Sequence, residues 1–181
     1  MTQDRFALKF LKEGATSPVQ RFIWPVPRGS RPGKWVEAQG ELKVCANGIH
    51  AVRLDRGALE WLDNPELWVI ELGGERFYDE QGHKLVARKG RLIRRIDGWN
   101  ETNQRLLATD CAYHVLGIFE KHRPSDKRPR EAIRAARQYA RRPTEANRKL
   151  MHAAGAAAGD AESDWQTHRL AHYIQVPELS R

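Results

Sequence analysis

The feature that most constrains the fold is a change in hydrophobic period near Trp99. Before it, short apolar runs alternate with glycine, proline and asparagine, which is typical of strands joined by tight turns. After it, apolar residues recur at intervals of four, four and three positions, as on one helical face: Leu107, Cys111, Val115 and Ile118. We therefore predict an α+β protein, with a small, mostly antiparallel β-rich N-terminal half packed on a C-terminal three-helix half.

The β-rich half contains apolar runs that we expect to form strands. They are residues 6–11, 41–45 with a continuation at 49–52, 67–72 and 84–96. The Asn-Gly pair between 41–45 and 49–52 predicts a hairpin turn. Gly73 and Gly74 are expected to end a strand, and Gly90 is expected to mark a bulge.

Prolines divide the helical half. Pro124 is expected to end the first helix, and the second runs from Arg130 to Arg142. Thr144 is expected to cap a third, alanine-rich helix that continues towards Ile174. We accordingly predict two domains, a β-rich one over residues 1–98 and a helical one over residues 99–181.

Charge is concentrated in one segment of the chain. The 31 Lys and Arg residues exceed the 23 Asp and Glu residues by eight. The window 121–149 holds eleven basic residues and three acidic ones, so it accounts for the whole net charge of +8. Such a localised charge points to an anionic partner, either an acidic protein or a nucleic acid.

The second helix carries the sharpest candidate binding surface. At 100° per residue one narrow stripe contains four arginines, and two basic residues precede it: Arg130, Arg134, Arg137 and Arg141, with Lys127 and Arg128. Guanidinium groups bind carboxylates and phosphates through paired hydrogen bonds. The simpler interpretation, a solvated helix face that pairs with the protein's own acids, stays open.

Nucleic-acid binding is an alternative. A second basic cluster lies between Lys84 and Arg95, and Trp24 and Trp35 flank a basic loop where they could stack on bases. Binding without sequence preference would then fall steeply with salt. The alanine-rich helical faces are equally suited to self-association, so a homo-oligomer is a further alternative.

Catalytic and metal-binding patterns are absent from the sequence. It contains no Walker loop, no G-x-S-x-G and no G-x-G-x-x-G, so the sequence favours a non-enzymatic protein. His168 and His172 share a helix face, but without H-E-x-x-H or a cysteine pair we expect no metal site and no cofactor. Two distant cysteines, a polar start and the lack of a long apolar run predict a cytoplasmic protein that does not contact membranes.

One resemblance concerns the N-terminal part. Cys45-Ala46-Asn47-Gly48-Ile49-His50-Ala51 and the strand His83-Lys84-Leu85-Val86-Ala87 resemble an uncharacterised domain family. Its members occur in actinobacteria and bacteriophages and carry a C-x-x-G-[IF]-H-A pattern. The resemblance covers residues 5–98 and implies no established activity.

A second resemblance concerns the helices. Asp110-Cys111-Ala112 and Ser125-Asp126-Lys127-Arg128-Pro129-Arg130-Glu131-Ala132-Ile133 resemble the helical module of immunity proteins from bacterial toxin systems, over residues 104–174. The resemblance implies binding and blocking of a protein, without catalysis. A third likeness, to ADP-ribosyltransferase-like folds, would make His50 and Glu71 the residues to suspect.

These observations favour a non-enzymatic binding protein, immunity-like or an accessory factor of a phage or other mobile element. The arginine stripe is expected to contact an acidic protein partner. A nucleic-acid-binding protein and an ADP-ribosyltransferase-like enzyme remain the alternatives.

Overall fold

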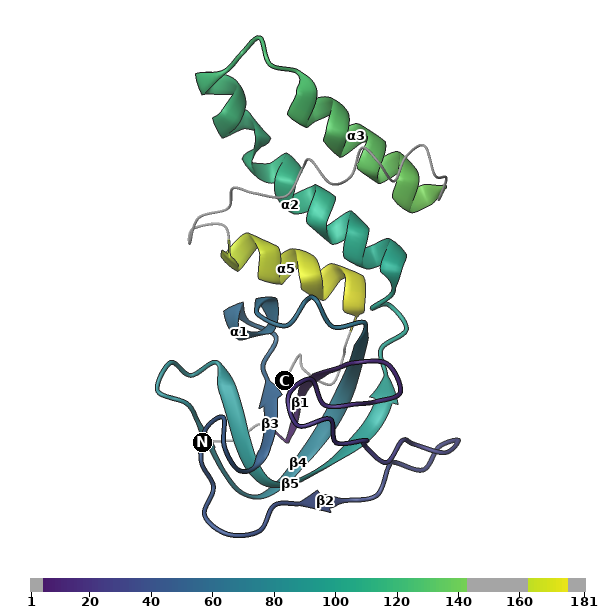
Figure 1. The fold of residues 1–181 in the computed structure, drawn as a ribbon, viewed down its shortest axis with the longest axis vertical. Coiled ribbons are helices and arrows are strands. Elements are labelled where there is room, and N and C mark those ends of the chain that lie inside the picture. Colours follow the sequence, from purple (N-terminus) through teal and green to yellow (C-terminus); the bar gives the residue numbers. More distant parts are fainter. Residues whose placement is uncertain (1–4, 143–162, 176–181) are drawn as a thin grey trace. The chain divides into compact units, whose positions relative to one another are not determined.

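The structure is a computed structural model that describes residues 5–142 and 163–175. The chain divides into two compact units. We call the first, Met1–Trp99 with Ile174–Arg181, the β unit, and the second, Asn100–Tyr173, the helical unit. Strands and one short helix make up the first, and helices the second, so the predicted α+β class is confirmed (Figure 1).

The β unit is a small antiparallel barrel. Its described elements are β1 (Phe6–Leu11), β2 (Val36–Glu37), β3 (Ile49–Val52), α1 (Arg56–Leu59), β4 (Glu66–Tyr78) and β5 (Lys84–Arg95). The sheet order is β2-β5-β3-β1-β4, and β5 also pairs with β4, so the ladder closes on itself. Closure leaves few free strand edges, since each of β1, β3, β4 and β5 has a partner on both sides.

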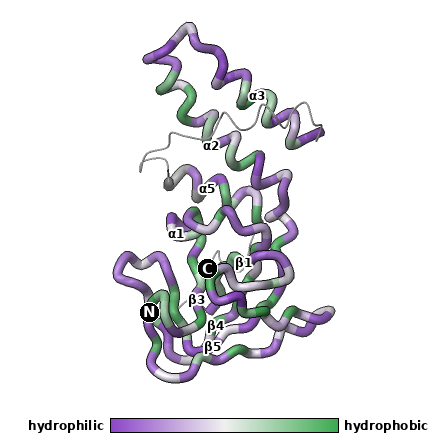
Figure 2. The backbone as a smooth tube through the Cα atoms, viewed as in Figure 1, coloured by the Kyte–Doolittle hydropathy of each residue, from purple (hydrophilic) through white to green (hydrophobic). Residues whose placement is uncertain are grey.

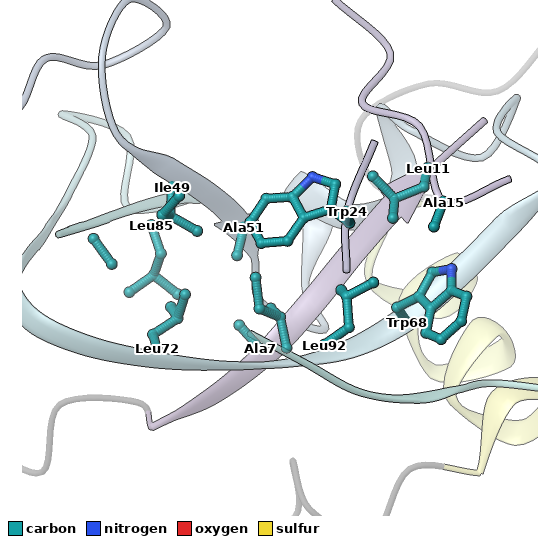
Figure 3. Packing of buried hydrophobic residues seen from close by; sticks show 12 residues of the cluster. Ala7, Leu11, Ala15, Trp24, Ile49, Ala51, Trp68, Leu72, Leu85 and Leu92 are labelled. Carbon is teal, nitrogen blue, oxygen red and sulfur yellow. The ribbon is translucent and has the colours of Figure 1, made fainter. Parts of the chain in front are cut away.

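The barrel core comes from alternate positions of the strands. Figure 3 shows apolar side chains from several strands gathered around the Trp24 ring. The cluster is made up of Ala7, Leu11, Ala15, Trp24, Ile49, Ala51, Trp68, Ile70, Leu72, Leu85, Ala87 and Leu92. The intervening residues Leu8 and Phe10 are buried as well, and Phe10 packs edge-on against Trp99. Both faces of β1 are therefore covered.

Two strand predictions were wrong. Residues 41–45 form no strand; Lys43 and Asn47 instead bridge each other in a tight turn that leads into β3. Gly73 and Gly74 do not end a strand, because β4 runs through them to Tyr78 with a register shift between Gly73 and Arg76. The shift absorbs the extra residue as a bulge, and Gly74 has the positive φ of 74° that suits glycine.

Gly90 serves close packing and is not a bulge. It lies in register with Leu72 on β4 and with Val36 on β2. A Cβ atom at this position would lie 2.7 Å from Ile49 Cγ2 and 3.0 Å from Ile70 Cδ1. The predicted bulge was therefore wrong, and glycine is required here because two core side chains approach the backbone closely.

The helical unit includes α2 (Glu101–His122), α3 (Arg128–Arg141) and α5 (Ser163–Ile174), the last residue of which belongs to the β unit. The Asn100 side chain caps α2 by accepting from the Asn103 amide, at 3.0 Å. Pro129 lies in the first turn of α3, where proline is tolerated because the backbone N–H groups have no intrahelical partner. Residues 143–162, including the predicted cap Thr144 and most of the alanine-rich segment, lie outside the described residues.

The helices bury one face each. Ile133, Ala136 and Tyr139 of α3 are buried, and hydrophobic and hydrophilic residues intermix along this helix (Figure 2). The predicted face of α2 is only partly buried, because Ile118 is 63% exposed while Leu116 is buried. Every helix in the described ranges is too short or too polar to cross a membrane.

Candidate functional site

The six predicted binding residues fall into two groups in the structure. The first group pairs with acids of its own unit. Arg130 forms two hydrogen bonds with Glu120 of α2, at 2.8 and 2.5 Å, and Arg128 forms two with Asp126, at 2.8 and 2.6 Å. Arg137 donates to Asp110 Oδ1 at 2.8 Å and lies 4.5 Å from the centre of the Tyr113 ring.

The second group is exposed. Arg134 and Arg141 are exposed, and neither forms an ion pair within the described residues. Lys127 is also exposed, and its ammonium donates to the Pro124 carbonyl at 2.8 Å. The stripe borders a surface hollow of about 840 Å³, which we call the arginine hollow. Its lining residues are Tyr113, Lys127, Arg130, Glu131, Ile133, Arg134, Arg137, Gln138, Arg141 and Arg142.

Asp110 is a buried acid that joins three helices. Its side chain is 10% exposed and accepts from Arg137 on α3, at 2.8 Å. On α5, Arg169 donates at 2.7 Å and the Tyr173 hydroxyl at 2.8 Å. Burial alone would raise the pKa of Asp110, but the hydrogen bonds from Tyr173, Arg169 and Arg137 outweigh it and lower the pKa. Arg137 is therefore part of the internal framework of this unit.

His50 lies on β3 beside the turn that precedes it. Its Nε2 accepts from the Cys45 amide at 2.9 Å, and its carbonyl accepts from Lys9 Nζ at 2.6 Å. Burial and the positive charge of Lys9 lower the pKa of His50, so the imidazole is neutral at pH 7. Gly48 has a φ of 136° in this turn, where a Cβ would lie 2.5 Å from Val86 Cγ1.

Glu71 lies on β4 and is fully engaged. Arg5 donates to its Oε1 at 2.8 Å and Arg91 to its Oε2 at 2.7 Å, and the side chain is 7% exposed. Burial would raise the pKa of Glu71, but hydrogen bonds from the two arginines lower it overall. His50 borders a cavity of about 380 Å³ in the β unit, whereas Glu71 is not among its lining residues. The two residues suspected from the ADP-ribosyltransferase likeness thus do not line a common pocket.

The second basic cluster is largely neutralised within the β unit. Lys84 pairs with Glu60 at 3.2 Å, Arg88 with Glu75 at 3.0 Å, and Arg91 with Glu71. Trp24 is 4% exposed and belongs to the core, so its predicted stacking role was wrong. Trp35 is 40% exposed, but Lys89 and Arg91 lie against its ring, at 5.2 and 4.6 Å.

No group of three potential metal-ligating side chains is found in the part of the chain that the structure describes. His172 is exposed, while the side chain of His168 lies outside the described residues.

One residue that the sequence analysis missed is Lys9. It shares one face of β1 with Ala7 and Leu11, two residues of the barrel core, and is only 9% exposed. Its ammonium lies 4.7 Å from the centre of the Trp24 ring. The available signal was the strand period, which places residue 9 on the same face as Ala7 and Leu11, but a lysine is rarely buried and is therefore expected to face solvent.

Comparison with known proteins assigns each part of the chain to a family model. Residues 100–175 match the family described as Imm-5 like putative immunity protein, which agrees with the predicted resemblance of the helices. Residues 6–104 match the domain of unknown function DUF7666, an uncharacterised family as predicted. The C-x-x-G-[IF]-H-A pattern stays a prediction. Searches of curated proteins and of solved structures found no match.

The match to residues 6–104 covers more than half of the 181-residue chain and spans the strands β1 to β5 with the start of α2. The protein therefore belongs to the DUF7666 domain family, and its helical part is similar to the Imm-5 like immunity proteins.

Proposed function

We propose that this chain is a non-enzymatic, immunity-like protein that binds and blocks an acidic protein partner through the arginine hollow. The observation that carries the proposal is the exposure of Arg134 and Arg141 without an acid partner among the described residues, in a unit similar to immunity proteins. Exposed guanidinium groups can form paired hydrogen bonds with carboxylates of a partner without first breaking an ion pair.

The arginines of the stripe that pair with acids of their own unit are expected to contribute differently to binding. Arg130 and Arg137 are held by Glu120 and Asp110, so they are expected to shape the hollow more than to bind. Tyr113 is 49% exposed beside them and adds an aromatic surface. Tyrosine and arginine are enriched among the residues that dominate the binding energy of protein interfaces. This enrichment favours a protein as the partner over a partner that is bound through charge alone.

Charge reversal at the exposed pair tests the proposal. The tagged full-length protein is used to capture partners from a bacterial lysate treated with nuclease, and the captured protein is identified and titrated. The double variant Arg134→Glu with Arg141→Glu is expected to lose at least tenfold in affinity, because two attractive contacts become repulsive. The matched control is Arg28→Glu with Arg31→Glu, two exposed arginines of the β unit, which should bind like the unmodified protein.

Three outcomes would overturn parts of this proposal. Equal affinity of the two double variants would exclude the arginine hollow as the contact. Capture of nucleic acid alone, with affinity for a labelled DNA strand that falls steeply with salt, would favour the nucleic-acid alternative. A captured protein whose contact surface carries no excess of acids would contradict the acidic partner.

A further inference from the structure

Lys9 is a buried ammonium whose surroundings do not satisfy it. An ammonium has three donors, and the described residues supply one acceptor, the His50 carbonyl at 2.6 Å. The other near contact is the face of Trp24. No carboxylate of the described residues pairs with Lys9, although buried charges in proteins are ordinarily paired.

Other buried charged side chains of the β unit have more hydrogen-bond partners than Lys9 has. Glu71 is held by two arginines, and Glu66 accepts from the Ala15 amide and from the Trp68 indole, at 3.1 and 3.0 Å. These acids are saturated by neighbours, while Lys9 is not. Burial lowers the pKa of Lys9 from 10.5 to about 8, so most of the molecules still carry the charge at pH 7.

Lys9 lines the cavity of about 380 Å³, a volume within the range of small-molecule sites. Much of its wall is apolar and aromatic, with Phe22, Trp24 and Trp61 among the lining residues. The Trp61 indole N–H is buried and has no hydrogen-bond partner in the described residues. The cavity therefore has the incompletely satisfied Lys9 ammonium beside an apolar wall, and such a site suits a ligand that has both acceptor atoms and an apolar body.

The other ionisable groups of the cavity are compatible with an anion. Lys84 is paired with Glu60, and the imidazole of His50 is neutral at pH 7. Glu37, an exposed residue, is the one acid among the lining residues that the structure describes, and the Cys45 thiol is the remaining ionisable group. From this geometry we propose that the β unit binds a small organic carboxylate, with its carboxyl group on Lys9 and its apolar body against Trp24.

The test compares carboxylates with their neutral amides. The full-length protein is titrated by calorimetry with benzoate, phenylacetate, 2-naphthoate and hexanoate, and with the amide of each. At least one carboxylate is expected to bind at least tenfold more tightly than its amide at pH 7. Its affinity should fall as the pH rises well above 8, because Lys9 then loses its proton in the free protein.

Two variants test whether Lys9 causes the preference for the carboxylate over the amide. Lys9→Met keeps the length and apolar stem of the side chain, and is expected to bind the carboxylate no better than the amide. Lys12→Met, at an exposed lysine just after β1, is the matched control and should bind like the unmodified protein. No preference for any carboxylate over its amide would overturn the proposal, and so would a preference that Lys9→Met retains. Circular dichroism of both variants shows that the loss does not come from unfolding.

Discussion

Asp110 of the helical unit and Lys9 of the β unit are both buried charged side chains, but they differ in their partners. Asp110 accepts hydrogen bonds from Arg137, Arg169 and Tyr173, which belong to two other helices. Lys9 has one carbonyl acceptor and an aromatic face. A saturated buried charge holds elements together, whereas an unsaturated one costs free energy unless a ligand completes it.

The comparison separates similar residues by whether they have a partner within their own unit. Arg137 and Arg134 lie three positions apart on α3, yet the first is tied to Asp110 and the second is exposed with no acid partner in residues 5–142 and 163–175. The same rule applied to lysines distinguishes Lys84, which pairs with Glu60, from Lys9. The presence of internal partners thus distinguishes residues that charge or position along a helix does not.

The largest effect is expected from Asp110→Asn, which keeps the shape of the side chain and removes its charge. The change leaves Arg137 and Arg169 without their acid. We expect a loss of about 3 kcal/mol in the free energy of unfolding, at the low end for a broken buried pair because both arginines are one-third exposed. Urea unfolding followed by circular dichroism at 222 nm measures it.

The control for this variant is Glu101→Gln, which removes the exposed partner of Arg105 at the start of α2. It should cost no more than about 0.5 kcal/mol. Because the pKa of Asp110 is lowered in the folded state, its contribution is present above its unfolded pKa and is lost as the pH falls through the folded value. Equal stabilities of the two variants would mean that Asp110 does not join the helices.

Lys9→Met is expected to stabilise the β unit, in contrast to Asp110→Asn. A fall of the pKa from 10.5 to about 8 corresponds to about 3 kcal/mol of penalty for the charged form. We expect about 2 kcal/mol of this to be recovered, since methionine also loses the hydrogen bond to His50. Thermal unfolding at pH 7 measures the difference.

The pH dependence of that difference has a definite sign. Between pH 8 and pH 10.5 the unfolded chain holds the Lys9 proton more tightly than the folded protein does. The unmodified protein should therefore gain stability relative to Lys9→Met over this range, and the advantage of the variant should shrink. An advantage that stays constant up to pH 10.5 would contradict a buried charged lysine.

Tyr173→Phe sharpens the comparison by removing a single partner of Asp110. The hydroxyl donates to Asp110 at 2.8 Å, and the two arginines remain. We expect a loss of about 1 kcal/mol, the usual value for one hydrogen bond. A loss for Tyr173→Phe as large as that of Asp110→Asn would show that the hydroxyl, and not the charge, dominates.

The smallest effect on stability is expected from Arg134→Gln with Arg141→Gln. Both side chains are exposed and have no acid partner in the described residues, so the free energy of unfolding should change by no more than about 0.5 kcal/mol. Arg137→Gln should cost more, because Asp110 then loses one of its donors. Denaturant unfolding of the three proteins in parallel tests this, and a double variant less stable than Arg137→Gln would contradict the division of the stripe.

Part of the fold was predictable from local patterns. The strand at Phe6–Leu11, the second helix with Pro129 in its first turn, and the buried face around Ile133 all follow from residue spacing and backbone restrictions. The structural roles of the glycines were predicted less well. Gly74 lies within a bulge of a continuous strand and Gly90 makes room for Ile49, and neither depends on neighbours in sequence.

The candidate sites were predictable only in outline. Helical spacing placed Arg130, Arg134, Arg137 and Arg141 on one stripe, but only the pairing of α2 with α3 shows which of them meet an acid. Asp110 lies on α2 and its partners lie 27 to 63 residues further along the chain. Lys9 was missed because alternation identifies the two faces of a strand without telling which face the rest of the chain covers.

The sequence alone determined the α+β class, the segments of strand and helix that depend on local periodicity, and the concentration of charge in 121–149. Tertiary structure decided the closure of the barrel, the saturation of Asp110 and the isolation of Lys9. The physical reason is the distance along the chain over which each kind of interaction acts. Periodicity and backbone preference act over a few residues, whereas burial and charge pairing depend on groups that only the folded chain brings together.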